Sequence, residues 1–97
     1  MSIDYETLKT MVLEKAKECV SRGRGYSQQK AVLDDVASEF GGNMHTSLDF
    51  DLQQAILTCW YDLFREGTLS WGLNLDNADP PFFHIPNRTE LHKKSAE

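Results

Sequence analysis

The sequence predicts a mainly helical α+β domain in which three helices precede a two-stranded β-hairpin. Three segments, 4–21, 27–40 and 49–66, repeat apolar residues at the spacing of one helix face. One or two glycines follow each segment within a few residues, and glycine readily ends a helix because it tolerates the left-handed conformation. After Gly67 the apolar residues alternate with polar ones, which is typical of a half-buried strand.

The chain length and composition favour a single globular domain. The chain has 97 residues, of which 40% are hydrophobic and 26% are charged, a balance typical of globular proteins and not of disordered ones. No apolar run approaches the roughly 18 residues of a membrane span, and residues 1–6 lack the features of a signal peptide. We therefore expect a cytoplasmic protein without membrane association, with its domain in residues 1–86 and a polar tail in 87–97.

The first predicted helix has one apolar stripe, formed by Leu8, Met11, Val12, Ala16, Cys19 and Val20. Ser2 or Asp4 is expected to cap its N-terminus, since both side chains can accept a hydrogen bond from the first turn. Cys19 and Cys59 are too few for a disulfide framework, and both lie on apolar stripes. We expect them to be buried, reduced thiols.

The second and third predicted helices follow the same pattern. Ser27 is expected to cap the second helix, whose apolar residues are Leu33, Val36, Ala37 and Phe40. The third helix has the strongest pattern, with apolar residues at Leu52, Ala55, Ile56, Cys59, Trp60, Leu63 and Phe64. Asp49 or Ser47 is expected to cap it, and Asp51 lies in its first turn, where the helix dipole favours negative charge. Segment 43–48 is the predicted linker between these two helices.

Two short strands are predicted after the third helix. Segments 68–71 and 82–85 are expected to pair as an antiparallel hairpin. Asparagine, aspartate and proline residues between them predict a loop at 73–81. Leu63 and Phe64 are expected to be buried where the third helix meets the hairpin.

Three helices followed by a hairpin is the order of elements in a winged helix-turn-helix domain, and the residues at the junction strengthen the resemblance. Residues 60–69, WYDLFREGTL, resemble the end of the third helix in that family, where an apolar pair precedes a charged residue, a glycine and an apolar strand residue. The Gly-x-Leu step and the Pro-Phe-Phe-His strand at 81–84 are similar to those of small uncharacterised prokaryotic winged-helix proteins. The resemblance covers about residues 5–86 and implies a three-helix winged helix whose wing is the hairpin loop at 73–81.

Catalytic and metal-binding motifs are absent from the sequence. Three histidines occur, in a predicted linker, a strand and the tail: His45, His84 and His92. None of them is spaced as a metal ligand with a cysteine or another histidine. The acidic pairs Asp34-Asp35 and Asp49/Asp51 are typical of a solvated helix face and a helix cap. We therefore expect no enzymatic activity, no cofactor, no metal and no small-molecule substrate.

Duplex DNA binding needs cations for the phosphates and polar side chains for the base edges. The candidate contacts lie around the start of the second helix and on the third helix: Arg22, Arg24, Lys30, Gln53 and Gln54. In a winged helix the third helix enters the major groove and the wing contacts the backbone or the minor groove. Here both elements are acidic, with Asp49 and Asp51 on the helix and Asp76 and Asp79 on the predicted wing.

The distribution of charge further disfavours a standard DNA-binding mode. The net charge of −5 excludes a protein that is broadly basic, and the predicted wing carries no cation. Other cations lie in the tail, at Arg88, Lys93 and Lys94. The connection 41–48 is also longer than the three or four residues of a tight helix-turn-helix.

Large aromatic residues crowd the end of the third helix and the hairpin. Trp60 and Tyr61 are adjacent on a helix and cannot both face one core, and Phe82 and Phe83 are adjacent on a strand and face opposite sides. Trp71 is expected where the core narrows, so that its indole stays available to a partner. Aromatic residues are enriched at interface hot spots. We therefore predict a partner-binding surface on the hairpin that includes Trp71 and either Phe82 or Phe83, with Tyr61 nearby.

The sequence therefore favours a protein-interaction module without enzymatic activity, acting as the small subunit or adaptor of a larger prokaryotic assembly. Its expected partner is another protein or a copy of itself. The alternative is a DNA-binding transcriptional regulator that uses the third helix (49–66) and the wing (68–86). The negative charge of these two elements decides the order of the two hypotheses.

Overall fold

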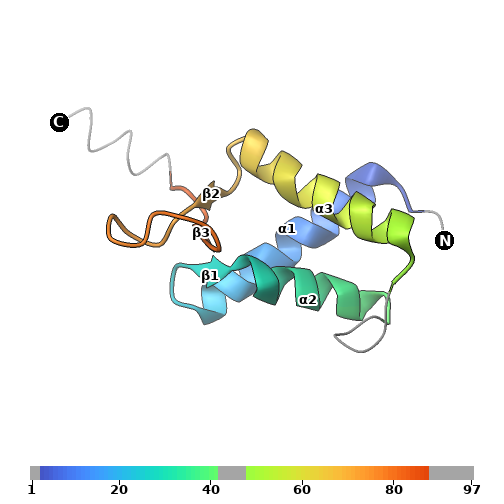
Figure 1. Cartoon of the computed structure of the whole chain (residues 1–97), viewed down its shortest axis with the longest axis horizontal. Coiled ribbons are helices and arrows are strands. Elements are labelled where there is room, and N and C mark those ends of the chain that lie inside the picture. Colours follow the sequence, from blue (N-terminus) through green and yellow to red (C-terminus); the bar gives the residue numbers. More distant parts are fainter. Residues whose placement is uncertain (1–2, 42–47, 88–97) are drawn as a thin grey trace.

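The computed structural model describes residues 3–41 and 48–87 and contains, within them, three helices and one antiparallel sheet (Figure 1). The elements follow in the order α1 (Tyr5–Arg22), β1 (Ser27–Gln28), α2 (Gln29–Glu39), α3 (Phe50–Arg65), β2 (Ser70–Trp71) and β3 (Phe82–His84). The mainly helical α+β class predicted from the sequence is confirmed. All three predicted helices are present, with ends within two residues of the expected positions.

Two aspartates cap the longer helices, as the sequence predicted. A carboxylate oxygen of Asp4 accepts a hydrogen bond from the Thr7 backbone N–H at 3.1 Å, and Asp49 accepts one from the Leu52 N–H at 3.4 Å. The alternative caps, Ser2 and Ser47, lie outside the described residues, as does most of the predicted linker 43–48. Each aspartate satisfies a backbone donor that a helix start leaves without a partner.

The start of α2 differs from the prediction. Ser27 does not cap this helix but belongs to β1, and α2 begins at Gln29 after a cap residue whose side chain makes no capping hydrogen bond. Ser27 lies opposite Phe83 and Gln28 opposite Phe82, while the Gln29 N–H donates to the Pro81 carbonyl at 2.9 Å. The sequence of β1, two polar residues, does not by itself favour a strand. This strand forms because it pairs with the edge of β3 that β2 does not occupy.

The predicted hairpin is present as the larger part of a three-stranded sheet with the order β1-β3-β2. In the hairpin, Ser70 lies opposite His84 and Trp71 opposite Phe83. The first strand is shorter than predicted because the N–H groups of Thr68 and Leu69 donate to the Leu63 carbonyl, at 2.9 and 3.1 Å, and close the end of α3. The chain reverses at Gly67, whose φ of +83° lies in the left-handed region that glycine tolerates.

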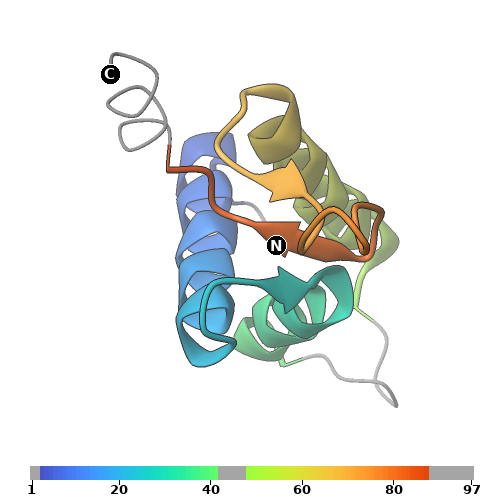
Figure 2. The ribbon, with the colours of Figure 1, turned by 90° about the vertical axis from the view of Figure 1, so that its left-hand side faces the viewer.

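The core lies between the three helices, and the sheet lies across one end of them (Figure 2). The buried core residues come from every helix, from β3 and from Leu69, which directly precedes β2: Leu8, Val12, Ala16, Cys19, Val32, Val36, Ile56, Cys59, Trp60, Leu63, Leu69 and Phe83. Leu63 is buried, as predicted, whereas Phe64 is only half-buried, although Trp71 stacks on its ring. Cys19 and Cys59 are buried free thiols, as predicted, and burial raises the pKa of both.

One polar contact fixes α2 to α3 beside the sheet. The indole N–H of Trp60, which has no exposed surface, donates to the Gln29 side-chain oxygen at 2.9 Å. The Tyr61 hydroxyl donates to the same oxygen at 3.3 Å. Gln29 therefore satisfies the buried indole donor and ties the first residue of α2 to two successive residues of α3.

We predict that Gln29→Leu destabilises the fold by about 1–3 kcal/mol, because the Trp60 indole N–H would remain buried without an acceptor. Urea denaturation followed by tryptophan fluorescence measures this loss. Gln28→Leu is the matched control, since Gln28 is exposed, and its effect should stay within about 0.5 kcal/mol. Equal unfolding midpoints for the two variants would show that the Gln29 contact contributes nothing.

Candidate functional site

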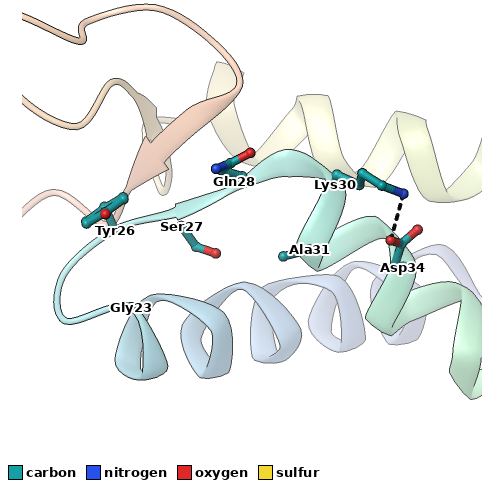
Figure 3. Close-up of a pocket in the computed structure, with 7 residues that line it drawn as sticks. All are labelled: Gly23, Tyr26, Ser27, Gln28, Lys30, Ala31 and Asp34. Carbon is teal, nitrogen blue, oxygen red and sulfur yellow. Dashed lines mark hydrogen bonds and ion pairs between the residues drawn. The ribbon is translucent and has the colours of Figure 1, made fainter.

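The cations predicted to contact nucleic acid lie at the turn between α1 and α2, but carboxylates hold two of the three. A guanidinium nitrogen of Arg22 lies 2.8 Å from a carboxylate oxygen of Asp35. The ammonium of Lys30 lies 3.0 Å from Asp34 (Figure 3). The hydrogen bond from Arg22 lowers the pKa of Asp35, so this carboxylate stays charged and continues to neutralise its partner. Arg24 alone among the three has no carboxylate partner in the described part of the chain.

A shallow hollow lies beside this turn, with a volume of about 430 Å³ (Figure 3). It is lined by the end of α1, by β1 and by the first turns of α2: Gly23, Tyr26, Ser27, Gln28, Lys30, Ala31 and Asp34. The charges in its lining are the compensated pair of Lys30 and Asp34. No nucleophilic side chain in this lining lies beside a general base, and the paired charges leave no net positive charge to attract an anion.

The described residues contain no group of three or more His, Cys, Asp or Glu side chains arranged to hold a metal ion. The ring of His84 makes a contact of 2.8 Å, through Nδ1, with the Gly72 carbonyl inside the hairpin, so this histidine supports the loop. The other two histidines, His45 and His92, lie outside the described residues. In residues 3–41 and 48–87 no helix is long and apolar enough to cross a membrane.

The outward face of α3 carries three large exposed side chains, of which Tyr61 alone was predicted to bind a partner. Phe50 is 67% exposed, Leu57 is 39% exposed and Tyr61 is 48% exposed. Together with the exposed Gln54 they follow a 4-3-4 spacing, which places them on one side of the helix, and we call this set the outer stripe. Of the predicted partner-binding residues, Tyr61 is the one that belongs to the outer stripe.

A second helical spacing in the sequence could have shown the outer stripe. The buried stripe of α3 is centred on Ile56, Cys59 and Leu63, and the outer stripe runs parallel to it on the opposite face. The sequence predicts the stronger stripe as the core face and Gln54 as a residue that contacts DNA bases. Both glutamines are exposed, but the Gln53 side-chain amide donates a hydrogen bond to the Leu48 carbonyl at 2.7 Å, whereas Gln54 belongs to the outer stripe.

Two hollows flank the outer stripe at Leu57. One, of about 180 Å³, lies between α2 and α3 and has a mostly apolar lining: Leu33, Ala37, Leu48, Gln53, Ile56 and Leu57. The other, of about 530 Å³, lies on the opposite side of the stripe and is lined by Gln54, Leu57, Thr58, Tyr61, Asp62 and Arg65. Leu57 therefore stands on a ridge with a depression on each side, a shape into which side chains of another protein can pack.

The charged flank of α3 is tied to α1. The Tyr5 hydroxyl donates to a carboxylate oxygen of Asp62 at 2.6 Å, and Lys9 forms an ion pair with Glu66. The hydrogen bond and the negative charge of Asp62 raise the pKa of Tyr5 to about 12. Arg65 lies 3.5 Å from the same carboxylate, but its side chain is 83% exposed.

Exposed carboxylates without an ion-pair partner among the described residues lie at the start of α3 and in the hairpin loop. Asp51 in the first turn of α3 is exposed, as are Asp76 and Asp79 in the hairpin loop. None of the ion pairs found among the described residues includes any of these three carboxylates. The expected negative charge of α3 and the loop therefore faces the solvent.

Trp71, predicted as the centre of a partner-binding surface on the hairpin, packs against aromatic residues of α3. Trp71 is half-buried and stacks on Phe64 with ring centroids 4.0 Å apart, and it also packs edge-on against Trp60 at 6.0 Å. The expectation that the core narrows before this indole is wrong, because Trp60 and Phe64 in the last two turns of α3 both pack against it. Trp71 remains next to Tyr61, with ring centroids 6.5 Å apart.

The two phenylalanines of β3 face opposite sides of the sheet, as predicted. Phe83 has no exposed surface and packs against Trp60 with ring centroids 5.1 Å apart. Its proposed contact with a partner is therefore corrected: Phe83 is a core residue. Phe82 is half-buried on the other side, edge-on to Tyr26 at 6.1 Å.

An exposed leucine, which the sequence did not predict as a surface residue, lies at the tip of the hairpin loop. Leu75 is 98% exposed, and the turn that carries it is held by Asn74, whose side-chain oxygen accepts a hydrogen bond from the Asn77 N–H at 2.8 Å. The Leu73 N–H donates to the Asn77 carbonyl at 2.7 Å. The loop predicted at 73–81 is thus confirmed as a loop, with an ordered turn at its tip.

Comparisons with protein-family models, with curated proteins and with solved structures found no match to this chain.

We predict that Asp62→Asn lowers the pKa of Tyr5 from about 12 toward its ordinary value, because the charged acceptor of its hydrogen bond is removed. Absorbance at the tyrosinate wavelength during an alkaline titration measures this pKa, and Tyr5→Phe identifies the step. Since the folded-state pKa is raised, the contribution to stability is present below the ordinary pKa near 10 and is lost as the pH rises through about 12. An unchanged titration in Asp62→Asn would contradict the assignment.

We predict that the isolated chain does not bind duplex DNA tightly at physiological salt, because Asp51, Asp76 and Asp79 face the solvent where phosphates would lie. Selection from random duplexes followed by a fluorescence-anisotropy titration tests this. A recovered sequence that binds at about 10⁻⁸ M or tighter, and that loses affinity with Gln54→Ala but not with Lys17→Ala, would reverse the conclusion.

Proposed function

We propose that this chain is a protein-interaction module of the winged-helix type, without enzymatic activity, that binds its partner through the outer stripe of α3. Its proposed role is that of a small subunit or adaptor in a larger prokaryotic assembly in the cytoplasm. One observation carries the proposal: the helix face that a DNA-binding winged helix inserts into the major groove here presents Phe50, Leu57 and Tyr61 to the solvent.

The arrangement of the elements supports the winged-helix part of the proposal. Three helices are followed by an antiparallel hairpin, and Gly67 reverses the chain directly after α3. Leu69 is 1% exposed and returns the chain to the core, which is the role the family resemblance implies for it. The additional strand β1 pairs with the free edge of β3 and leaves the hairpin intact.

The chemistry of the exposed face supports a protein partner over a nucleic acid. Three large apolar or aromatic side chains aligned on one helix face form a patch, whereas exposed apolar residues in monomeric proteins are usually scattered. Tyrosine is enriched among residues that dominate binding energy, and Tyr61, the last residue of the outer stripe, lies next to Trp71 with ring centroids 6.5 Å apart. The DNA-binding alternative gains no support, since Arg22 and Lys30 are neutralised by carboxylates.

Site-specific cross-linking in the native host tests the proposal. A photoreactive amino acid at position 57 should form a covalent adduct with a partner protein, because Leu57 stands on the ridge of the outer stripe. The matched control is position 17, since Lys17 is exposed on α1 and outside the stripe. We expect adducts from position 57 that Tyr61→Ala removes, and none from position 17.

Two results would contradict this proposal. Equal adducts from positions 57 and 17 would mean that the outer stripe is not a docking surface. Adducts from position 57 only with nucleic acid would restore the regulator hypothesis. Circular dichroism of each variant confirms that the fold is retained before the comparison is made.

A further inference from the structure

We propose that the outer stripe binds a second copy of this chain, with the two α3 helices packed antiparallel across a two-fold axis near Leu57. This inference rests on the proposed function, since it names the partner of the same surface. It is carried by the spacing of the stripe, by the position of two charges beside it and by the shape of the hollows around Leu57.

The spacing of the outer stripe fits packing against another helix. Residues 50, 54, 57 and 61 follow a 4-3-4 pattern, which keeps one seam of a helix facing a partner helix along its length. The exposed members of the seam are two aromatic residues, a leucine and Gln54. A polar residue within such a seam commonly fixes the register between two helices.

The charges beside the seam select an antiparallel arrangement. Asp51 and Arg65 lie 14 positions apart on the same flank of α3, one in the first turn and the other at the end. When two copies run in opposite directions, the same flanks face each other, so Asp51 of one copy lies beside Arg65 of the other. The symmetry forms this ion pair twice, and the helix dipoles are opposed as well.

The intramolecular contacts leave both charges available for this pairing. Asp51 takes part in no ion pair among the described residues. Arg65 contacts Asp62 only at 3.5 Å with its side chain 83% exposed, and Asp62 keeps the Tyr5 hydroxyl as a second partner when Arg65 turns away. A parallel arrangement would instead place the two equivalent flanks on opposite sides of the seam and Asp51 and Arg65 at opposite ends of it, so that this ion pair could not form.

The shape of the molecule leaves room for the antiparallel pair. The hairpin projects beyond the C-terminal end of α3, away from the N-terminal end of that helix (Figure 1). The two hairpins of a dimer therefore lie at opposite ends of the paired helices. With the axis near Leu57, Tyr61 of one copy lies opposite Gln54 of the other, and each Leu57 faces the hollow beside the partner's Thr58.

The contact is smaller than that of a permanent dimer. The 16 residues of α3 extend about 24 Å at 1.5 Å per residue, and one helix pair covers less than the roughly 800 Å² per partner of a standard interface. We therefore expect a reversible dimer with a dissociation constant on the order of 10–100 µM.

Sedimentation velocity of the purified chain tests this inference over a range from about 5 µM to about 1 mM, which brackets the expected constant. Leu57→Arg should weaken the dimer at least about tenfold, because it places two cations at the axis. Asp51→Arg and Arg65→Asp should each weaken it by about fivefold to tenfold, since each brings like charges together twice. The double variant Asp51→Arg/Arg65→Asp should restore the wild-type constant to within about threefold.

The control for net charge is Asp76→Arg in the hairpin loop, which changes the charge of the chain as much as Asp51→Arg does. It should leave the dissociation constant unchanged within about twofold. A wild-type chain that stays monomeric at about 1 mM would overturn the inference, as would a dimer that persists in Leu57→Arg. Failure to restore the dimer in the double variant would overturn the antiparallel arrangement.

The outcome separates this inference from the proposed function. A monomeric chain whose position 57 cross-links to a different protein overturns the second-copy partner and leaves the interaction module standing. A monomeric chain without specific adducts at position 57 overturns both. A dimer sensitive to Leu57→Arg, with adducts at position 57 between two copies of the chain, supports both.

Discussion

The burial of Trp60 holds the domain together. Its side chain has no exposed surface and packs edge-on against Phe64 of its own helix, Trp71 of β2 and Phe83 of β3, with ring centroids 4.8, 6.0 and 5.1 Å away. Its indole N–H is satisfied by Gln29 at the start of α2. One side chain therefore joins α3, the sheet and α2, and the only polar group it buries has an acceptor.

The same burial determines which face of α3 is exposed, and this is the face proposed to bind a partner. Successive residues of a helix point about 100° apart, so an inward Trp60 turns Tyr61 toward the solvent, and Leu57 follows on the same outer side. The exposed aromatic face of α3 is thus a geometric consequence of how its inner face is packed. Because α1 ties the charged flank through Tyr5 and Asp62, the helix cannot rotate to hide its outer stripe without losing these contacts.

The helices and the hairpin could be predicted because their signals are local. Apolar spacing, an aspartate cap such as Asp49 and the glycine at 67 lie within the segments that they shape. The strand β1 could not be predicted, since its two polar residues form a strand only through β3. Because side chains alternate along a strand, the sequence predicts that Phe82 and Phe83 face opposite sides but does not say which of them is buried. The stacking of Trp71 on Phe64 depends on the position of α3 relative to the sheet, which the sequence does not give. The outer stripe was visible in the spacing, but exposure on the folded molecule was needed to separate it from a core stripe.

The central position of β3 also determines the order in which the sheet can form during synthesis. Within the described residues, β3 is the last strand and the only neighbour of both β1 and β2. Neither of those strands can pair before residues 82–84 have left the ribosome, whereas the helices depend mainly on local contacts and can form earlier. Until then the inner side of Trp60 lacks the cover that Phe83 provides, so the nascent domain exposes its aromatic core until its final strand arrives.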